Sequence, residues 1–197
     1  PAPTEPVCIE FRQVSLLGSE HRAALLTAIQ AQLLPAQRIA VTGPSGAGKT
    51  SLLESLLGFQ QPDQGQIMIG DHGLTDLNLA QWRQQLVYLS QQSQWLKGSL
   101  RSNLLLAKAS ATEAELKLVL QQAFCADFVF ALPQGLDTQL AESGIGLSGG
   151  QLQRLALARA LLKQSWCWLL DEPASMLPPE QQQLYFQQLE QLSRGKT

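Results

Sequence analysis

Residues 43–50 read Gly43-Pro44-Ser45-Gly46-Ala47-Gly48-Lys49-Thr50. One glycine, four variable residues, a second glycine, a lysine and a threonine have the spacing of a phosphate-binding loop. Such a loop lies between a strand and a helix, because backbone N–H groups at a helix start bind the phosphate. The sequence predicts both, a short apolar strand at 38–42 and a helix at 49–57 that ends at Gly58. The alternative, a glycine-rich turn with a chance lysine, is disfavoured by this context.

The side chains after the second glycine supply the specific contacts expected of such a loop. The ammonium of Lys49 is expected to reach the β- and γ-phosphates of a nucleotide, and the hydroxyl of Thr50 to ligate Mg²⁺. Ser51, in the first turn of the predicted helix, completes the expected nucleotide-binding segment.

An acidic pair, Asp171-Glu172, follows the apolar run Trp166–Leu170. The run predicts a buried strand, and ligands of open α/β sheets bind at the carboxyl ends of strands. Asp171 is expected to hold Mg²⁺ through water, and Glu172 to polarise the water that attacks the nucleotide. The alternative is an exposed acidic turn, which is an odd continuation of a buried strand.

Between these two segments the chain reads Leu147-Ser148-Gly149-Gly150-Gln151, and Ser148 is expected to cap a helix that continues to about Lys163. Taken alone, this stretch could be a helix N-terminus with flexible glycines. Its flanks are also distinctive and read Asp137-Thr138 and Glu142-x-Gly144 before it, and Gln153-Arg154-x-Ala156-x-Ala158-Arg159-Ala160-Leu161 after it.

The phosphate loop, this stretch and the acidic pair, in this order, resemble the nucleotide-binding domain of the ATP-binding cassette (ABC) family, exporter type. The likeness extends over nearly the whole chain. It implies an ATPase that binds ATP and Mg²⁺ and forms a head-to-tail dimer with a second nucleotide-binding domain. In such a dimer each protomer's signature closes over the ATP of the other, and the signature residues here are Ser148, Gly149, Gly150 and Gln151.

The resemblance also assigns a role to Gln91, which follows a predicted strand at Leu86–Leu89. The family's Q-loop glutamine senses Mg²⁺ and the γ-phosphate and links to the transport domain, so Gln91 is expected to take part in catalysis and in metal contact. Neighbouring Gln92 and Gln94 leave the register open, and Gln91 could also be one of many solvated glutamines.

The order of the predicted elements indicates an α/β fold with a P-loop NTPase core. Alternating strands and helices predict a mostly parallel core sheet, with an antiparallel β subdomain at the N-terminus. A helical subdomain associated with the signature is expected at about 92–148, and residues 1–6 read as a linker. Residues 1–197 are expected to form one nucleotide-binding domain, cut from a longer protein before the family's switch histidine. The other expected elements are strands at 7–14, 28–33 and 66–69 and helices at about 112–124 and 178–192.

Three departures from the family pattern accompany the resemblance. The stretch Leu16-Leu17-Gly18 lacks the aromatic that stacks on adenine, and Pro178 stands where the family's D-loop ends in aspartate, which suggests a heterodimer with two unequal sites. His21 and His72 do not fall at the position of the switch histidine and are interpreted as surface residues. Without that histidine, the chain is expected to bind Mg-ATP but to hydrolyse it weakly.

The overall composition narrows the class of partner. A net charge of −2 and a pI of about 5.7 disfavour nucleic acid as the main ligand. No apolar run approaches the roughly 20 residues that cross a bilayer. Cys8, Cys125 and Cys167 lie far apart, which predicts reduced thiols in a cytoplasmic protein.

The leading interpretation is the ATPase of an exporter, a soluble chain at the cytoplasmic face of the inner (plasma) membrane whose parent protein is membrane-embedded. Its transmembrane domain would lie upstream in the same chain or in a separate subunit. The segments 82–83 and 131–138 are similar to exporters that serve cytochrome bd assembly, which suggests cysteine, glutathione or a haem-related compound as cargo. One alternative is a soluble ABC-type ATPase of DNA repair or translation, but such a protein usually carries a coiled coil or a basic insertion. A second alternative is a small-molecule P-loop kinase, in which the signature has no role. A third is a purely structural ATP-binding module, against which Glu172 argues.

Overall fold

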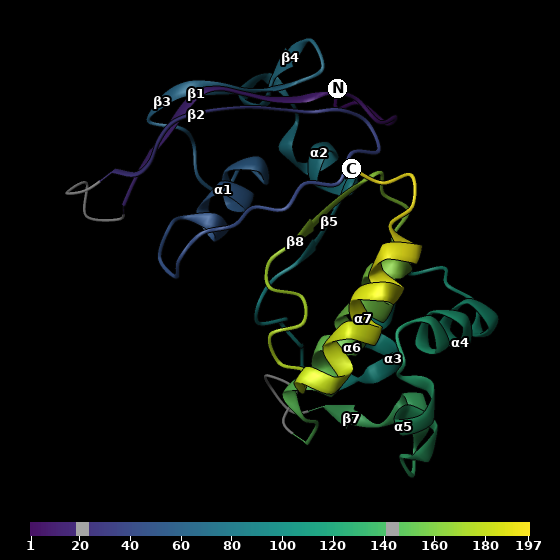
Figure 1. Ribbon diagram of the computed structural model, residues 1–197. Helices are drawn as coiled ribbons and strands as arrows, with labels where there is room; N and C mark the ends of the chain where they lie inside the picture. The colour runs from purple at the N-terminus through teal and green to yellow at the C-terminus, as the bar shows by residue number, and fades with distance from the viewer. Residues whose placement is uncertain (19–23, 141–145) are drawn as a thin grey trace. The chain divides into compact units, whose positions relative to one another are not determined.

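The computed structural model describes residues 1–18, 24–140 and 146–197 (Figure 1). Within these residues the chain forms two compact units. The first unit contains Pro1–Val87, Ser165–Asp171 and Ser193–Thr197, and the second contains Tyr88–Gln164 and Glu172–Leu192. Each unit buries apolar side chains of its own.

Four strands of the first unit form an antiparallel sheet, which confirms the prediction for the N-terminal part of the chain. Their order is β2-β1-β3-β4, and Figure 1 shows the three long strands side by side. The strands are β1 (Ile9–Leu17), β2 (Ala24–Leu33), β3 (Gln64–Ile69) and β4 (His72–Gly73).

A bulge in β1 keeps its apolar side chains on the buried face. Phe11 and Val14 are both buried although they are three residues apart, and the register shifts between them where Gln13 has a φ of 53°. On the neighbouring strand, a Cβ on Gly65 would lie 2.2 Å from the Gln13 carbonyl oxygen. Only glycine fits there, so the two residues together fix the register at this point.

The first unit also contains α1 (Lys49–Leu56), η1 (Leu74–Asp76) and α2 (Leu79–Gln84). The end of α1 is held by Trp82, which is fully buried and donates its indole N–H to the Leu56 carbonyl at 2.8 Å. Arg83 donates to the next carbonyl, that of Leu57, also at 2.8 Å. These bonds satisfy carbonyls that the helix end leaves without a partner inside the helix.

The predicted strand at 38–42 is wrong in this structure. None of the sheets in the described part of the chain includes these residues, and Ile39 and Val41 are 46% and 44% exposed. The physical reason is that an apolar run of five residues favours a strand conformation, but a strand also requires a neighbouring segment to which its backbone can hydrogen-bond. The run by itself does not supply that segment.

A separate two-stranded sheet pairs β5 (Leu86–Leu89) with β8 (Cys167–Leu170). Both strands were expected from their apolar sequences, and Cys167 N donates to the Gln85 carbonyl at 3.4 Å beside them. A mostly parallel core sheet stays a prediction.

The second unit is mainly helical. Its first helices lie within the range 92–148, although the helical subdomain itself stays a prediction. Thr112 and Ser148 each form a capping box with the residue three positions later, as expected for the starts of α4 and α6. The elements that lie wholly in this unit are β6 (Gly98–Ser99), α3 (Leu100–Leu105), α4 (Glu113–Gln122), α5 (Ala126–Ala131), η2 (Gly135–Asp137), β7 (Gln139–Leu140), α6 (Gly149–Leu161) and α7 (Pro179–Leu192). No helix in the described part of the chain is both long enough and apolar enough to cross a bilayer.

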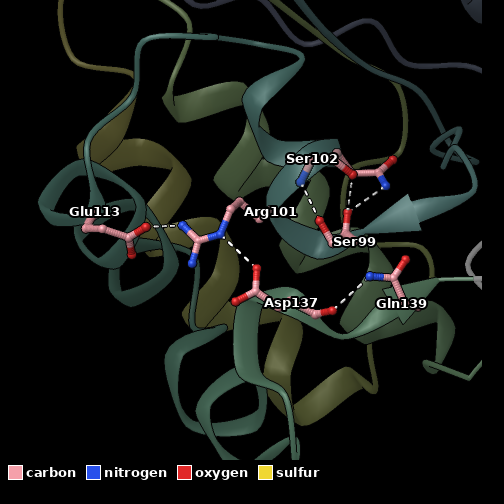
Figure 2. A network of polar contacts seen from close by, with 7 residues as sticks. Ser99, Arg101, Ser102, Glu113, Asp137 and Gln139 are labelled. Atoms are coloured by element: carbon pink, nitrogen blue, oxygen red, sulfur yellow. Dashed lines mark hydrogen bonds and ion pairs between the residues drawn. The ribbon is translucent and has the colours of Figure 1, made fainter.

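A polar network joins four of these elements (Figure 2). Arg101 on α3 donates to Asp137 of η2 at 2.9 Å and pairs with Glu113 at the start of α4. These hydrogen bonds, first of all the one to Asp137, raise the pKa of Arg101. Gln139 donates to the Asp137 carbonyl at 3.0 Å and extends the network to β7. The network fixes the segment that leads towards the signature.

Candidate functional site

The phosphate loop lies in the first unit and leads directly into α1. Gly46 and Gly48 have φ values of 80° and 84°, in the left-handed region that favours glycine. The Lys49 ammonium donates to the carbonyls of Gly43 and Pro44 at 3.0 and 2.9 Å. The lysine therefore bonds to the backbone at the start of its own loop.

Thr50 and Asp171 meet although they are 121 residues apart in sequence. The Thr50 hydroxyl donates to the Asp171 carboxylate at 2.7 Å, and both residues belong to the first unit. Asp171 follows β8 directly and is only 6% exposed. Both side chains present oxygen atoms, which are the ligands that Mg²⁺ prefers. The structure thus brings together two of the three residues predicted to contact the metal.

Gln91 and Glu172 meet in the second unit. The Gln91 amide donates to the Glu172 carboxylate at 3.0 Å, and Glu172 is exposed. Glu172 has a φ of 48°, which is unfavourable for any residue other than glycine. The two predicted catalytic residues are therefore neighbours, and their catalytic roles stay predictions.

The signature begins α6. Ser148 Oγ accepts from Gln151 N at 3.3 Å, and Gln151 Oε1 accepts from Ser148 N at 2.8 Å. A Cβ on Gly150 would lie 3.1 Å from the Met176 carbonyl oxygen, so the helix start approaches the segment after Glu172 closely. The signature glycine has a packing role within its own chain here.

Gln153 is a further residue at this place, and in the sequence it stood out only as part of the signature's flank. Its side chain is 7% exposed, and its amide donates to the Glu172 carbonyl at 3.2 Å and accepts from Met176 N at 3.1 Å. Its place two residues after the signature was the only sequence signal available, because the turn that it contacts lies 19 to 23 residues away.

The segment that follows Gln91 is held by Arg159 of α6. Its guanidinium donates to the Gln94 carbonyl at 3.0 Å and lies 4.6 Å from the ring centroid of buried Trp95. Burial lowers the pKa of Arg159. The signature helix thus contacts both the Gln91 segment and the turn after Glu172, all within the second unit.

Several remaining predictions concern single residues. Leu16, in the stretch that lacks the adenine-stacking aromatic, is fully buried in β1. His72 is exposed, as expected. Met176 is 43% exposed, whereas Leu177 is buried. His21 and the flank residues Glu142 and Gly144 lie outside the described residues. Among the described residues, no group of three or more His, Cys, Asp or Glu side chains could hold a metal ion.

Comparisons with known proteins identify the family. The model of the family described as ABC transporter matches residues 26–175. The glutathione/L-cysteine transport system ATP-binding/permease protein CydD of Escherichia coli (strain K12) is 38% identical over 196 residues, covering 100% of this chain and 33% of that protein. The ATP-dependent lipid A-core flippase of Alkalilimnicola ehrlichii is 36% identical over 190 residues, covering 96% of this chain and 32% of that protein.

A solved structure, that of a bacterial Atm1-family ABC exporter with ATP bound, is similar with a TM-score of 0.92 and 29% sequence identity. The likeness covers 100% of this chain and 34% of that one. This chain therefore spans about a third of the length of each of these three proteins. The chain belongs to the ABC transporter family, and it corresponds to the ATP-binding domain of such a transporter.

Proposed function

We propose that this chain binds and hydrolyses Mg-ATP and thereby drives a membrane exporter. The observation that carries the proposal is the 2.7 Å hydrogen bond between the Thr50 hydroxyl and the Asp171 carboxylate. A hydroxyl that follows the loop lysine and a carboxylate at a strand end are the two protein groups that hold magnesium beside the phosphates in P-loop ATPases. Their meeting supports a nucleotide site over a glycine-rich turn and a separate acidic turn.

In this proposal residues 43–51 bind the phosphates. The backbone N–H groups of the loop surround the β-phosphate, and Lys49 exchanges its bonds to the Gly43 and Pro44 carbonyls for bonds to phosphate oxygens. Thr50 and Asp171 would hold Mg²⁺, which keeps several of its waters and therefore needs only one or two protein ligands. When bound, the ion neutralises charge on the phosphates.

Glu172 is the proposed group that polarises the attacking water. Its carboxylate is exposed and accepts a hydrogen bond from Gln91, so one oxygen is oriented by the amide while the other remains free to accept from water. Gln91 would hold this orientation and sense the γ-phosphate. The hydrogen bond between Gln91 and Glu172, which both belong to the second unit, supports a shared catalytic role for the two residues.

The signature is proposed to act on a second copy of the site. The start of α6, where Ser148 and Gln151 form the capping box, carries the positive end of a 13-residue helix. In a head-to-tail dimer, Ser148, Gly149, Gly150 and Gln151 would close over the ATP of the partner domain. Each chain would thus contribute half of each of two sites, and ATP would draw the two domains together.

Two of the similar proteins support a function in transport. CydD is described as a glutathione/L-cysteine transport system protein, and the structural neighbour is an exporter. We propose that transmembrane segments, in the same protein or in a separate subunit, bind the cargo, and that this domain works at the cytoplasmic face of the membrane. Cysteine, glutathione or a haem-related compound is the proposed cargo. Pro178, in place of the D-loop aspartate, supports a heterodimer with unequal sites.

Hydrolysis is tested by Glu172→Gln, with Glu180→Gln on an exposed part of α7 as the matched control. Single-turnover hydrolysis of labelled ATP by excess protein should slow about 100-fold in Glu172→Gln, because the water loses its base. The affinity of Glu172→Gln for a fluorescent ATP analogue should equal that of the unsubstituted chain. In sedimentation experiments with ATP, the variant should persist as a dimer. Equal rates for Glu172→Gln and the unsubstituted chain would overturn the role of Glu172, and failure of the unsubstituted chain to bind ATP would overturn the proposed function.

The cargo is tested separately, with this domain joined to its membrane segments in proteoliposomes. ATP-dependent movement of radiolabelled cysteine or glutathione, lost in Glu172→Gln, is the expected result. Movement of neither thiol nor of a haem compound would overturn the cargo assignment while leaving the ATPase proposal intact.

A further inference from the structure

Gln153 lies between the signature and the proposed catalytic residue. It is in the first half of α6 and is 7% exposed, so its amide is removed from bulk water. Both ends of the amide are used, since Nε2 donates to the Glu172 carbonyl at 3.2 Å and Oε1 accepts from Met176 N at 3.1 Å. One side chain therefore holds both ends of the turn from Glu172 to Met176.

The turn that Gln153 holds is conformationally unfavourable. Glu172 has a φ of 48°, and Ser175 N also donates to its carbonyl, at 3.0 Å. A residue other than glycine keeps such a conformation only where its surroundings over-determine it, and such strain is concentrated at functional sites. The bonds from Gln153 help to hold Glu172 in this conformation. Glu172 is also the residue whose carboxylate accepts a hydrogen bond from Gln91.

The same turn lies against the first residues of the signature helix. A Cβ on Gly150 would lie 3.1 Å from the Met176 carbonyl oxygen, and one on Gly149 would lie 3.5 Å from the Met176 sulfur. Because Gln153 is part of this helix, a displacement of the helix start would be transmitted to the Glu172 carbonyl through one hydrogen bond. A residue that only filled space would need neither its donor nor its acceptor here.

We infer that Gln153 is a positioning residue for Glu172, which ties the orientation of the proposed catalytic carboxylate to the signature helix. The inference rests on the proposed function, because it assumes that Glu172 polarises the attacking water. It acts through the Glu172 backbone and makes no contact with nucleotide. It predicts that loss of the Gln153 amide slows the chemical step and leaves nucleotide affinity unchanged.

The test compares Gln153→Met with Gln182→Met. Methionine keeps a similar volume and flexibility but removes the amide. Gln182 provides a matched control, since it donates to the Leu177 carbonyl at 2.9 Å, just beyond the same turn, without touching Glu172. Single-turnover ATP hydrolysis should slow about 10-fold or more in Gln153→Met, the size of effect expected when a catalytic group is misplaced by a fraction of an ångström. The rate of Gln182→Met and the ATP affinity of both variants should stay close to those of the unsubstituted chain.

A third variant separates the two hydrogen bonds. Gln153→Glu retains an acceptor for Met176 N and loses the donor to the Glu172 carbonyl. It should retain slow hydrogen exchange at the Met176 amide, which Gln153→Met should lose, yet it should hydrolyse ATP as slowly as Gln153→Met.

Two results would overturn the inference. One is an equal loss of rate in Gln153→Met and Gln182→Met, which would mean that any loosening near the turn has the same effect. The other is hydrolysis at the unsubstituted rate in Gln153→Met. By contrast, a Glu172→Gln variant that hydrolyses ATP normally would overturn the proposed role of Glu172, and failure of the unsubstituted chain to bind ATP would overturn the proposed function, so these failures are distinguishable from failure of the inference.

Discussion

At the residue scale, the charge of Lys49 is expected to have a different bonding partner with and without bound nucleotide. In this structure its ammonium donates to two carbonyls of its own loop, at 3.0 and 2.9 Å. A phosphate is a stronger acceptor for an ammonium than a carbonyl is, because the bond is between full charges. Lys49→Ala should therefore weaken ATP binding at least about 10-fold, measured by titration with a fluorescent ATP analogue.

The matched control for this prediction is Lys117→Ala, at an exposed position of α4. It removes the same charge from the chain and should leave ATP affinity unchanged. Unaltered affinity in Lys49→Ala would refute the role assigned to the lysine, and an equal loss in both variants would attribute the effect to net charge.

At the scale of the element, α4 and α6 begin with the same device. Thr112 with Glu115 and Ser148 with Gln151 each form a capping box. Removing the hydroxyl of a helix cap lowers the free energy of unfolding by about 1 kcal/mol. Thr112→Ala and Ser148→Ala should therefore lower stability to a similar degree in urea unfolding, while only Ser148→Ala also weakens the ATP-dependent dimer.

This pair of variants provides its own control, because the structural change is the same and only the proposed role differs. Dimer formation is measured by sedimentation in the Glu172→Gln background with Mg-ATP. Equal dimer affinity in the two cap variants would contradict the proposed contact of Ser148 with the partner's nucleotide.

At the scale of the whole molecule, burial determines which thiols can react. Cys125 is fully buried and Cys167 is 1% exposed, whereas Cys8 is half-buried. Burial raises the pKa of both buried thiols, to about 12 for Cys167, so neither forms the reactive thiolate at pH 8. Iodoacetamide should therefore label the native chain at Cys8 alone and the urea-unfolded chain at all three positions, as read by peptide mass spectrometry.

The same burial gives stability a pH dependence whose sign is fixed. Because the folded-state pKa of Cys125 and Cys167 is raised, their contribution to stability is fully present below the thiol pKa of the unfolded chain, about 8.5. It is lost as the pH rises above that value, because only the unfolded chain then releases the protons.

Rapid labelling of Cys125 or Cys167 in the native chain at pH 8 would contradict the burial described.

Much of the fold was predictable because its signals are local. The helix after the phosphate loop, the capping boxes of α4 and α6, and the strands β1, β3 and β8 each depend on residues within a few positions of one another. The strand expected at 38–42 failed for the opposite reason, since a strand exists only if a distant segment pairs with it. The Gln13 bulge was also invisible, because it depends on the backbone of Gly65 across the sheet.

The sequence by itself determined which residues are chemically suited to a nucleotide site, since the phosphate loop, the acidic pair and the signature are defined by residue type and spacing. Only the tertiary structure decided which of them meet. Thr50 and Asp171 are 121 residues apart, and Gln91 and Glu172 are 81 apart, so their hydrogen bonds depend on the path of the folded backbone. The role of Gln153 is decided in the same way, because a buried amide acquires its function from whichever backbone groups the fold places beside it.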